Sequence, residues 1–289
     1  MMRIEHICAG ARPDSLRNDD HVAVFTSAGV TDIVVIDGGS SVANRDYIDE
    51  RQGDVAWFVH AFAAALQKAL QPGRDQQECV WIAIADVRTR FKHLTAGQDV
   101  PLHAWPIAAM TWLRMSHQDG AARATLYSLG DCKTLLYTAT GTCIDPDPFV
   151  NPQEAILQDC IATLKAEGID DPLHRRERML PMLRARRESQ NTVPAPGVLC
   201  LEPNGPFQAR LRSISLAEDA SLLMMTDGFY RLVDLYGLYT DTALVEACIE
   251  FGLEAQLDKL RNHESNCTGT ATRAVKSADD ASAVLWSAT

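Results

Sequence analysis

Acidic residues recur at the ends of the predicted strands, where a sheet could gather them along one edge. Two β-rich runs, 21–25 and 32–37, are separated by a turn-like segment and predict a hairpin. In such a hairpin the start of the first strand lies beside the end of the second, so Asp20 is expected to face Asp37. Neighbouring strands lie about 4.8 Å apart, which lets the two carboxylates share one cation.

The same placement recurs further along the chain. Any single Asp-Gly after a strand is more often a turn than a ligand, but several acids at matching strand ends predict a metal site. Carboxylates gathered at one place repel one another and tend to bind protons unless a cation neutralises them. We expect Mg²⁺ or Mn²⁺, because hard cations prefer oxygen ligands and the His and Cys residues show no zinc-type spacing. The further acids are Asp131 in a predicted hairpin turn, Asp227 after a strand, and Asp279 and Asp280 before the last strand.

The elements that must position these acids are many strands and several long helices. Helices are predicted over 53–70, 78–94 and 240–261 from their apolar spacing and end signals. Together the elements predict a layered α+β sandwich, in which helices cover sheet faces. The predicted strands are a meander over 106–115, 122–129 and 133–139, and later runs over 197–203, 209–216, 221–228 and 281–286.

A helical insertion is predicted at about 145–196, with helices over 152–167 and 173–188. It is too short to hold its own core, so we expect one domain over 1–289 that carries this insertion. The segment 174–187, "HRRERMLPMLRARR", places six arginines in it. Two interpretations stay open: a docking surface for a phosphorylated substrate, since arginine suits phosphate, or a solvated helix face paired with local acids.

Composition excludes several classes of protein. With 27 Lys and Arg against 38 Asp and Glu, the formal charge of −11 predicts neither a nucleic-acid nor a membrane partner. The chain has no apolar window of membrane-spanning length and no signal-peptide pattern at its N-terminus, so we expect a cytoplasmic protein. The eight scattered cysteines are expected to be reduced and buried as small hydrophobic residues.

Five motifs, in this order, resemble those of the metal-dependent protein phosphatases of the type-2C class. The resemblance spans nearly the whole chain and is to bacterial-type, single-domain members. It implies a four-layer α-β-β-α sandwich, with central antiparallel β-sheets flanked by helix pairs. The motifs are "RNDD" (17–20), "VVIDGG" (34–39), "SLGDCKTLLY" (128–137), "ASLLMMTDGFYRLVD" (220–234) and "SADDASAVLW" (277–286).

The resemblance also implies an activity: hydrolysis of phosphate monoesters, on phosphoserine or phosphothreonine of proteins, by a water activated between two metal ions. Asp37 and Asp227 would then be catalytic, and a phosphorylated protein would be the partner. The ligands implied for Mn²⁺ or Mg²⁺ are Asp37 bridging both ions, Asp19 and the Gly38 carbonyl on one, Asp227 and Asp279 on the other, Asp20 holding metal-bound water, and Asp131 for a third ion.

The chain departs from the family pattern at several positions. Asp19 is one methylene shorter than the usual Glu, and Gly39 stands where many relatives carry Met or His. The phosphate-binding arginine is assigned to Arg17, with Arg12 further back. These departures leave an alternative function open, that of a phosphatase-like regulatory or binding protein without turnover. Metal-dependent hydrolysis distinguishes the two, and the sequence predicts neither the substrate's identity nor the oligomeric state.

Overall fold

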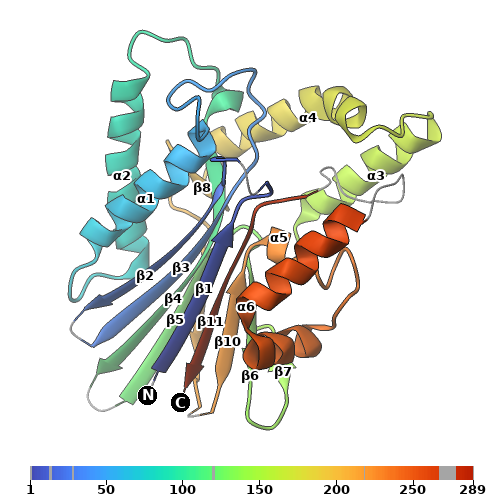
Figure 1. Cartoon of the computed structure of the whole chain (residues 1–289). Coiled ribbons are helices and arrows are strands. Elements are labelled where there is room, and N and C mark those ends of the chain that lie inside the picture. The colour runs from blue at the N-terminus through green and yellow to red at the C-terminus, as the bar shows by residue number, and fades with distance from the viewer. Residues whose placement is uncertain are drawn as a thin grey trace.

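Two antiparallel sheets pack face to face, and helices cover the outer side of each (Figure 1). This computed structural model describes residues 2–12, 15–27, 29–118, 121–217, 219–266 and 278–288. The four layers follow the order helix, sheet, sheet, helix, which confirms the predicted α-β-β-α sandwich. Both ends of the chain lie at the same end of the sandwich, away from helices α3 and α4.

The first sheet contains the predicted hairpin. In it Asp20 pairs with Asp37 across the two strands, as predicted. The strand order is β2-β3-β4-β5-β9, and the short β8 pairs with the start of β4. The strands are β2 (Asp20–Ser27), β3 (Val30–Gly38), β4 (Ile107–Gln118), β5 (Ala121–Leu129), β8 (Leu199–Cys200) and β9 (Arg210–Ile214).

The second sheet brings the two ends of the chain together. Its order is β1-β11-β10-β6-β7, and β1 pairs antiparallel with β11 from Met2 opposite Ala288 to Ala9 opposite Ala281. Strand β1 was not predicted, because its side chains are mostly exposed or half-buried and show no clear apolar alternation. The strands are β1 (Met2–Ala9), β6 (Lys133–Tyr137), β7 (Cys143–Ile144), β10 (Ser221–Met225) and β11 (Ala281–Ala288).

The predicted meander is wrong at its second connection. Strand β5 pairs with β4 and β9 in the first sheet, whereas β6 pairs with β10 in the second. The segment 130–132 is therefore a crossing between the sheets, and not a hairpin turn. Local strand patterns could not distinguish the two, because both need a tight, glycine-containing connection.

The central part of strand β3, residues 33–36, is apolar because both faces of the strand are covered there. Ile33 and Val35 pack between the two sheets, whereas Val34 and Ile36 pack against the helices on the outer side. All four side chains are fully buried. A strand with both faces covered loses the polar alternation of a half-exposed strand, and its register is fixed by burial on both sides.

The helices form three groups. The pair α1 and α2 covers the first sheet and matches the predictions over 53–70 and 78–94. Helices α5 and α6 cover the second sheet, and α6 bends at Gly252, where the backbone φ is +82°. Helices α3 and α4 project at one end of the sandwich (Figure 1). The bounds are α1 (Asp54–Ala69), α2 (Gln76–Leu94), α3 (Pro152–Ala166), α4 (Pro172–Thr192), α5 (Asp227–Tyr230) and α6 (Asp241–Asn266), with a 3-10 turn at Leu102–Ala104.

The cysteines follow the expectation in part. The seven in the described part of the chain are all free thiols, and Cys79, Cys132, Cys200 and Cys248 are buried. The burial prediction is wrong for Cys8, which is exposed, while Cys267 lies outside the described residues. Among the described helices, none has the length and apolar character needed to cross a membrane.

A buried ion pair fixes the first sheet to the helices above it. Asp32 on β3 accepts hydrogen bonds from Arg114 Nε at 2.7 Å and from Trp112 Nε1 at 2.8 Å. The Arg114 guanidinium also donates to the backbone carbonyl of Arg74, which precedes α2, at 2.8 Å. The carboxylate therefore satisfies two buried donors on the neighbouring strand β4.

We expect Asp32→Ala to lower the free energy of unfolding by about 3 kcal/mol, because it leaves Arg114 and the Trp112 indole N–H without their buried acceptor. Urea denaturation measures this change. The matched control is Asp86→Ala, which breaks an exposed Arg90 pair on α2 and should cost less than about 1 kcal/mol. Equal losses in the two variants would contradict this account of the buried pair.

Candidate functional site

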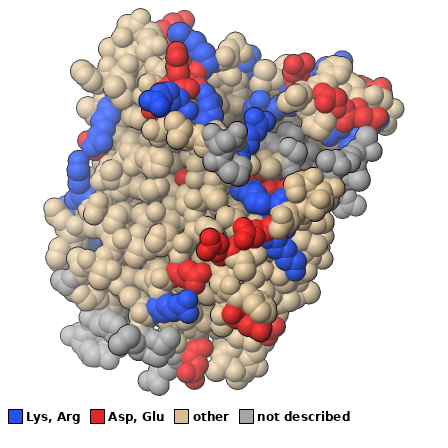
Figure 2. All heavy atoms as spheres, viewed as in Figure 1, with Lys and Arg blue, Asp and Glu red and all other residues tan. Residues whose placement is uncertain are grey.

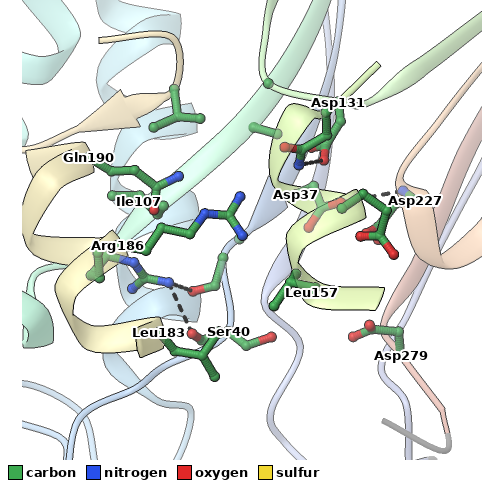
Figure 3. A pocket seen from close by; sticks show the side chains of 18 of the residues that line it. Asp37, Ser40, Ile107, Asp131, Leu157, Leu183, Arg186, Gln190, Asp227 and Asp279 are labelled. Atoms are coloured by element: carbon green, nitrogen blue, oxygen red, sulfur yellow. Dashed lines mark hydrogen bonds between the residues drawn. The ribbon is translucent and has the colours of Figure 1, made fainter. Parts of the chain in front are cut away.

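A cavity of about 490 Å³ opens at the end of the sandwich where α3 and α4 project. Figure 3 shows acids on one side of it, with Arg186 and Gln190 of α4 on the other. The lining includes most of the predicted site residues. Those that line it are Asp20, Asp37, Gly38, Asp131, Asp227 and Asp279, together with Asp280.

The acids reach this cavity from both sheets. Asp37 is the last but one residue of β3 in the first sheet, while Asp227 begins α5, with one residue between it and the end of β10 in the second. The backbone N–H of Asp227 lies 3.4 Å from Asp37 Oδ2, although the two residues are 190 positions apart. Asp131 lies in the crossing from β5 to β6. The prediction that strand ends gather these acids is therefore confirmed for the described residues.

The glycines after two of the acids permit this close approach. A Cβ atom on Gly38 would lie 2.3 Å from the Asp19 carbonyl oxygen, and one on Gly228 would lie 1.8 Å from the Asp280 carbonyl oxygen. Both distances are shorter than any real contact, so neither position accepts a side chain. Here glycine serves close packing of backbone on backbone, and not a turn with positive φ.

Burial and mutual repulsion shape the electrostatics of the cluster. Burial, followed by the charge of Asp227, raises the pKa of Asp37 well above its ordinary value. Burial also raises the pKa of Asp20, although the Thr226 hydroxyl, 2.8 Å from its Oδ2, opposes this. Burial and then the charges of Asp279 and Asp131 raise the pKa of Asp227 to about 7. Asp227 is solvent-accessible through the cavity but surrounded by protein on its other sides.

Two neighbouring acids in this cluster have different environments. Asp280 is held by backbone donors, with its Oδ1 accepting from Ala11 N and its Oδ2 from Asp19 N, both at 2.7 Å. Asp279 instead pairs with Arg231 at 2.6 Å and lines the cavity. Asp280 therefore connects the strand ends, whereas Asp279 is positioned by the Arg231 side chain.

Oxygen is the donor type throughout the cluster, and this fits a hard divalent cation. Within the described ranges, no three His, Cys, Asp or Glu side chains already converge as a metal-ligand group. The carboxylates are close enough to raise one another's pKa, yet they must rotate inward to hold an ion together. Cation binding would relieve the repulsion that raises the pKa of Asp37 and Asp227.

Two predicted site residues lie outside the cavity lining. Arg17 donates to Asp46 Oδ2 at 2.6 Å and to the Glu50 carbonyl at 3.1 Å, on the loop before α1. Asp19 contributes its backbone: its carbonyl accepts from Gly38 N at 3.0 Å. The structure therefore does not bring the Arg17 guanidinium to the acids, and phosphate binding by Arg17 stays a prediction that this geometry does not support.

The arginines of α4 have a role that the sequence did not reveal. Three of them hold the loop that follows Asp37, through backbone carbonyls. Arg187 is buried and donates to the carbonyls of Gly39 at 2.9 Å and Ser40 at 3.0 Å. Arg176 donates to Ser41 O at 2.7 Å, and Arg184 to Val42 O at 2.9 Å. The expected solvated face paired with acids is therefore wrong for these three, which form a clamp on residues 39–42.

The clamp also accounts for Gly39. A Cβ atom there would lie 2.9 Å from Ile107 Cγ1 and 3.1 Å from an Arg187 guanidinium nitrogen. The space that a methionine or histidine side chain would need is already filled. The departure at Gly39 and the arginine-rich insertion are thus two parts of one arrangement.

The surface around the cavity carries both signs of charge. On the face shown in Figure 2, Lys and Arg side chains lie among Asp and Glu side chains and do not form one continuous basic patch. A nucleic-acid-binding surface would require such a patch. The chemistry on this face is concentrated in the cavity.

No protein-family model matches this sequence, and no curated protein matches it either. Solved structures do match, at low sequence identity. The S. agalactiae serine/threonine phosphatase is 13% identical with a TM-score of 0.57, and the match covers 100% of both chains. PppA, a regulatory component of the T6SS in Pseudomonas aeruginosa, is 11% identical with a TM-score of 0.53, over 100% of this chain and 98% of PppA.

A third structure contains metal. The catalytic domain of the serine/threonine protein phosphatase PstP, in complex with 2 manganese ions, is 15% identical with a TM-score of 0.50 and covers 99% of this chain and 97% of that one. At such identities the likeness concerns the fold alone. The chain therefore has the fold of the type-2C, or PPM, phosphatases over its whole length.

We expect the pH dependence of stability to report the repulsion at Asp227. Because its pKa is about 7 when folded and 3.8 ordinarily, the unfolded chain ionises first, and folding loses stability as pH rises from about 4 to 7. With chelator at pH 8, Asp227→Asn should be more stable than wild type by about 1 kcal/mol, since water in the cavity screens part of the effect. Urea denaturation from pH 4 to 8 measures this.

The control for this experiment is Asp258→Asn, at an exposed position on α6. Its stability should follow the wild-type pH curve. A wild-type curve that rises from pH 4 to 7, or an Asp227→Asn variant that is no more stable at pH 8, would show that the carboxylates do not repel one another in the folded chain.

We expect Arg187→Met to lower the free energy of unfolding by about 2 kcal/mol, because two buried carbonyls lose a charged donor. Amide hydrogen exchange at residues 39–42 should become faster. Arg178→Met, at an exposed position on the same helix, is the matched control and should change neither property. Unchanged exchange in Arg187→Met would contradict the clamp.

Proposed function

We propose that this chain is a metal-dependent phosphatase that hydrolyses phosphate monoesters, with phosphoserine or phosphothreonine on proteins as the substrate. One observation carries the proposal: Asp37, Asp131, Asp227 and Asp279 line a single cavity in a chain with the fold of serine/threonine phosphatases. Cations would relieve the repulsion between clustered carboxylates, and the same cations would neutralise the charge of a phosphate monoester.

Asp37, Asp227, Asp279 and the Gly38 carbonyl would hold Mn²⁺ or Mg²⁺, with Asp20 beside them and Asp131 at the rim. Two such ions would supply an activated water and stabilise charge on the phosphoryl oxygens. The manganese ions of the PstP catalytic domain support this choice of metal. Arg231, paired with Asp279, and the backbone donors on Asp280 fix the positions of two neighbouring carboxylates.

The lining of the cavity supports attack by water rather than by a thiol, an imidazole or a hydroxyl side chain. Among the described residues that line it there is no Cys, His, Lys or Tyr, and Ser40 is the single hydroxyl residue. Ser40 lies in the clamped loop, where its carbonyl accepts from Arg187, and no basic side chain of the lining is placed to activate it. A phosphoenzyme route therefore lacks both a reactive thiol and a histidine nucleophile.

A second function is supported by the departures near the N-terminal motif. Arg17 is engaged by Asp46, and Asp19 does not line the cavity. A phosphatase-like protein that binds a phosphorylated partner without turnover would keep the cavity but not the full catalytic set. Hydrolysis measurements separate this regulatory binder from the enzyme.

The test is hydrolysis of p-nitrophenyl phosphate and of a phosphothreonine peptide with Mn²⁺, with Mg²⁺ and with chelator. Wild type should turn over both substrates only with metal. Asp37→Asn and Asp227→Asn should each lose about a hundredfold in kcat or more, the scale of losing one charge contact in the transition state. Asp258→Asn should remain as active as wild type.

Calorimetric titration with Mn²⁺ completes this test. Binding by wild type, weakened in Asp37→Asn, together with turnover, would support the enzyme. Binding without turnover on either substrate would favour the regulatory binder. An absence of Mn²⁺ and Mg²⁺ binding to wild type would refute both, because each depends on the carboxylate site.

A further inference from the structure

Arg186 on α4 differs from the other arginines of its helix. In the described part of the chain it makes no hydrogen bond or ion pair, and its Nε atom is buried without a partner. It lines the cavity, on the side opposite the acids in Figure 3. A charged group that is partly buried without an acceptor costs stability, so its placement needs an explanation outside the folding of the chain.

Two acids of the cavity lining, Asp131 and Glu154, act electrostatically on Arg186. Burial lowers its pKa, while the negative charges of Asp131 and Glu154 oppose that shift. A guanidinium stays protonated at neutral pH. Asp131 Oδ2 already accepts from Asn151 at 2.7 Å, so the nearest acid of the cluster has another partner. The positive charge therefore faces the cavity.

The other arginines of the lining form hydrogen bonds or ion pairs with groups of the chain itself. Arg176 and Arg187 donate to loop carbonyls, and Arg231 pairs with Asp279. Arg17, the residue that sequence similarity suggested for phosphate, pairs with Asp46. Of these five arginines, Arg186 is the one that makes no hydrogen bond or ion pair within the described structure.

We propose that Arg186 binds the phosphoryl oxygens of the substrate, so that the helical insertion supplies the phosphate contact in place of the N-terminal motif. This proposal rests on the phosphatase function proposed above. The planar guanidinium presents two parallel N–H groups that match two oxygens of a phosphate. Gln190, one helical turn further along α4, also lines the cavity and offers an amide N–H beside it.

The arginine clamp gives this contact a fixed geometry. Arg184 and Arg187 flank Arg186 in the sequence and hold Val42 and Gly39, in the loop that leaves Asp37. The position of Arg186 is therefore tied to that of Asp37 through hydrogen bonds on both sides of it. A phosphate held between them would contact α4 on one side and the carboxylate site on the other.

The experiment measures inorganic phosphate binding by calorimetry, with and without Mn²⁺, and the kinetics of p-nitrophenyl phosphate hydrolysis. Arg186→Gln should weaken phosphate binding and raise KM by about tenfold to a hundredfold, the effect of losing hydrogen bonds to a charged group. Arg186→Lys should recover part of this through its charge alone. Arg178→Gln, an exposed arginine on the same helix, is the matched control and should bind phosphate as wild type does.

Thermal unfolding distinguishes binding from a structural role. Because Arg186 has no partner in the described chain, Arg186→Gln should leave Tm unchanged or higher. A lower Tm, or phosphate affinity and KM equal to wild type, would overturn the proposal.

The two proposals fail in different ways. Turnover by wild type with an unaffected Arg186→Gln variant would leave the phosphatase standing and refute the role of Arg186. Phosphate binding that depends on Arg186 without turnover would support Arg186 and refute the enzyme. Wild type that binds no phosphate, with or without Mn²⁺, would refute the role of Arg186 directly.

Discussion

Repulsion between carboxylates clustered at one cavity is the constraint on which the rest of this structure depends. Asp37, Asp131, Asp227 and Asp279 come from both sheets and meet at one cavity, where burial and neighbouring charge raise the pKa of Asp37 and Asp227. A fold gains no stability from such an arrangement unless cations or donors compensate it. Groups of the chain itself compensate these charges in part. Arg231 forms an ion pair with Asp279, the Thr226 hydroxyl donates a hydrogen bond to Asp20, and a backbone N–H donates to Asp280.

Arginine side chains of α4 lie on the side of the cavity opposite these acids. Helix α4 brings its arginines to the loop after Asp37, and three of them donate to backbone carbonyls of that loop. The clamp therefore fixes the distance between the two walls, and Arg186 adds a positive charge that the chain leaves available. In the proposed function, a dianionic ester would contact both the cations held by the carboxylates and the Arg186 guanidinium.

Local sequence patterns correctly predicted the features that depend on residues close together in the chain. The pairing of Asp20 with Asp37 followed from one hairpin, and α1 and α2 followed from apolar spacing. Long-range pairings were less accessible: β1 was missed because its partner β11 lies at the other end of the chain, and the crossing at 130–132 looked like a turn. The clamp was missed for a similar reason, because Arg187 and Gly39 are 148 residues apart and their contact is to a backbone carbonyl, which carries no residue-type signal.

The pairing of β1 with β11 has a consequence for the order of events during synthesis. Strand β11 fills the second sheet between β1 and β10, and Asp279 lies just before it. A nascent chain whose β11 segment has not yet left the ribosome lacks both the strand between β1 and β10 and one wall of the acidic cavity. Contacts between such distant segments form late, since the loop between them must first close. The cavity is therefore complete only once β11 has been synthesised and has paired with β1 and β10.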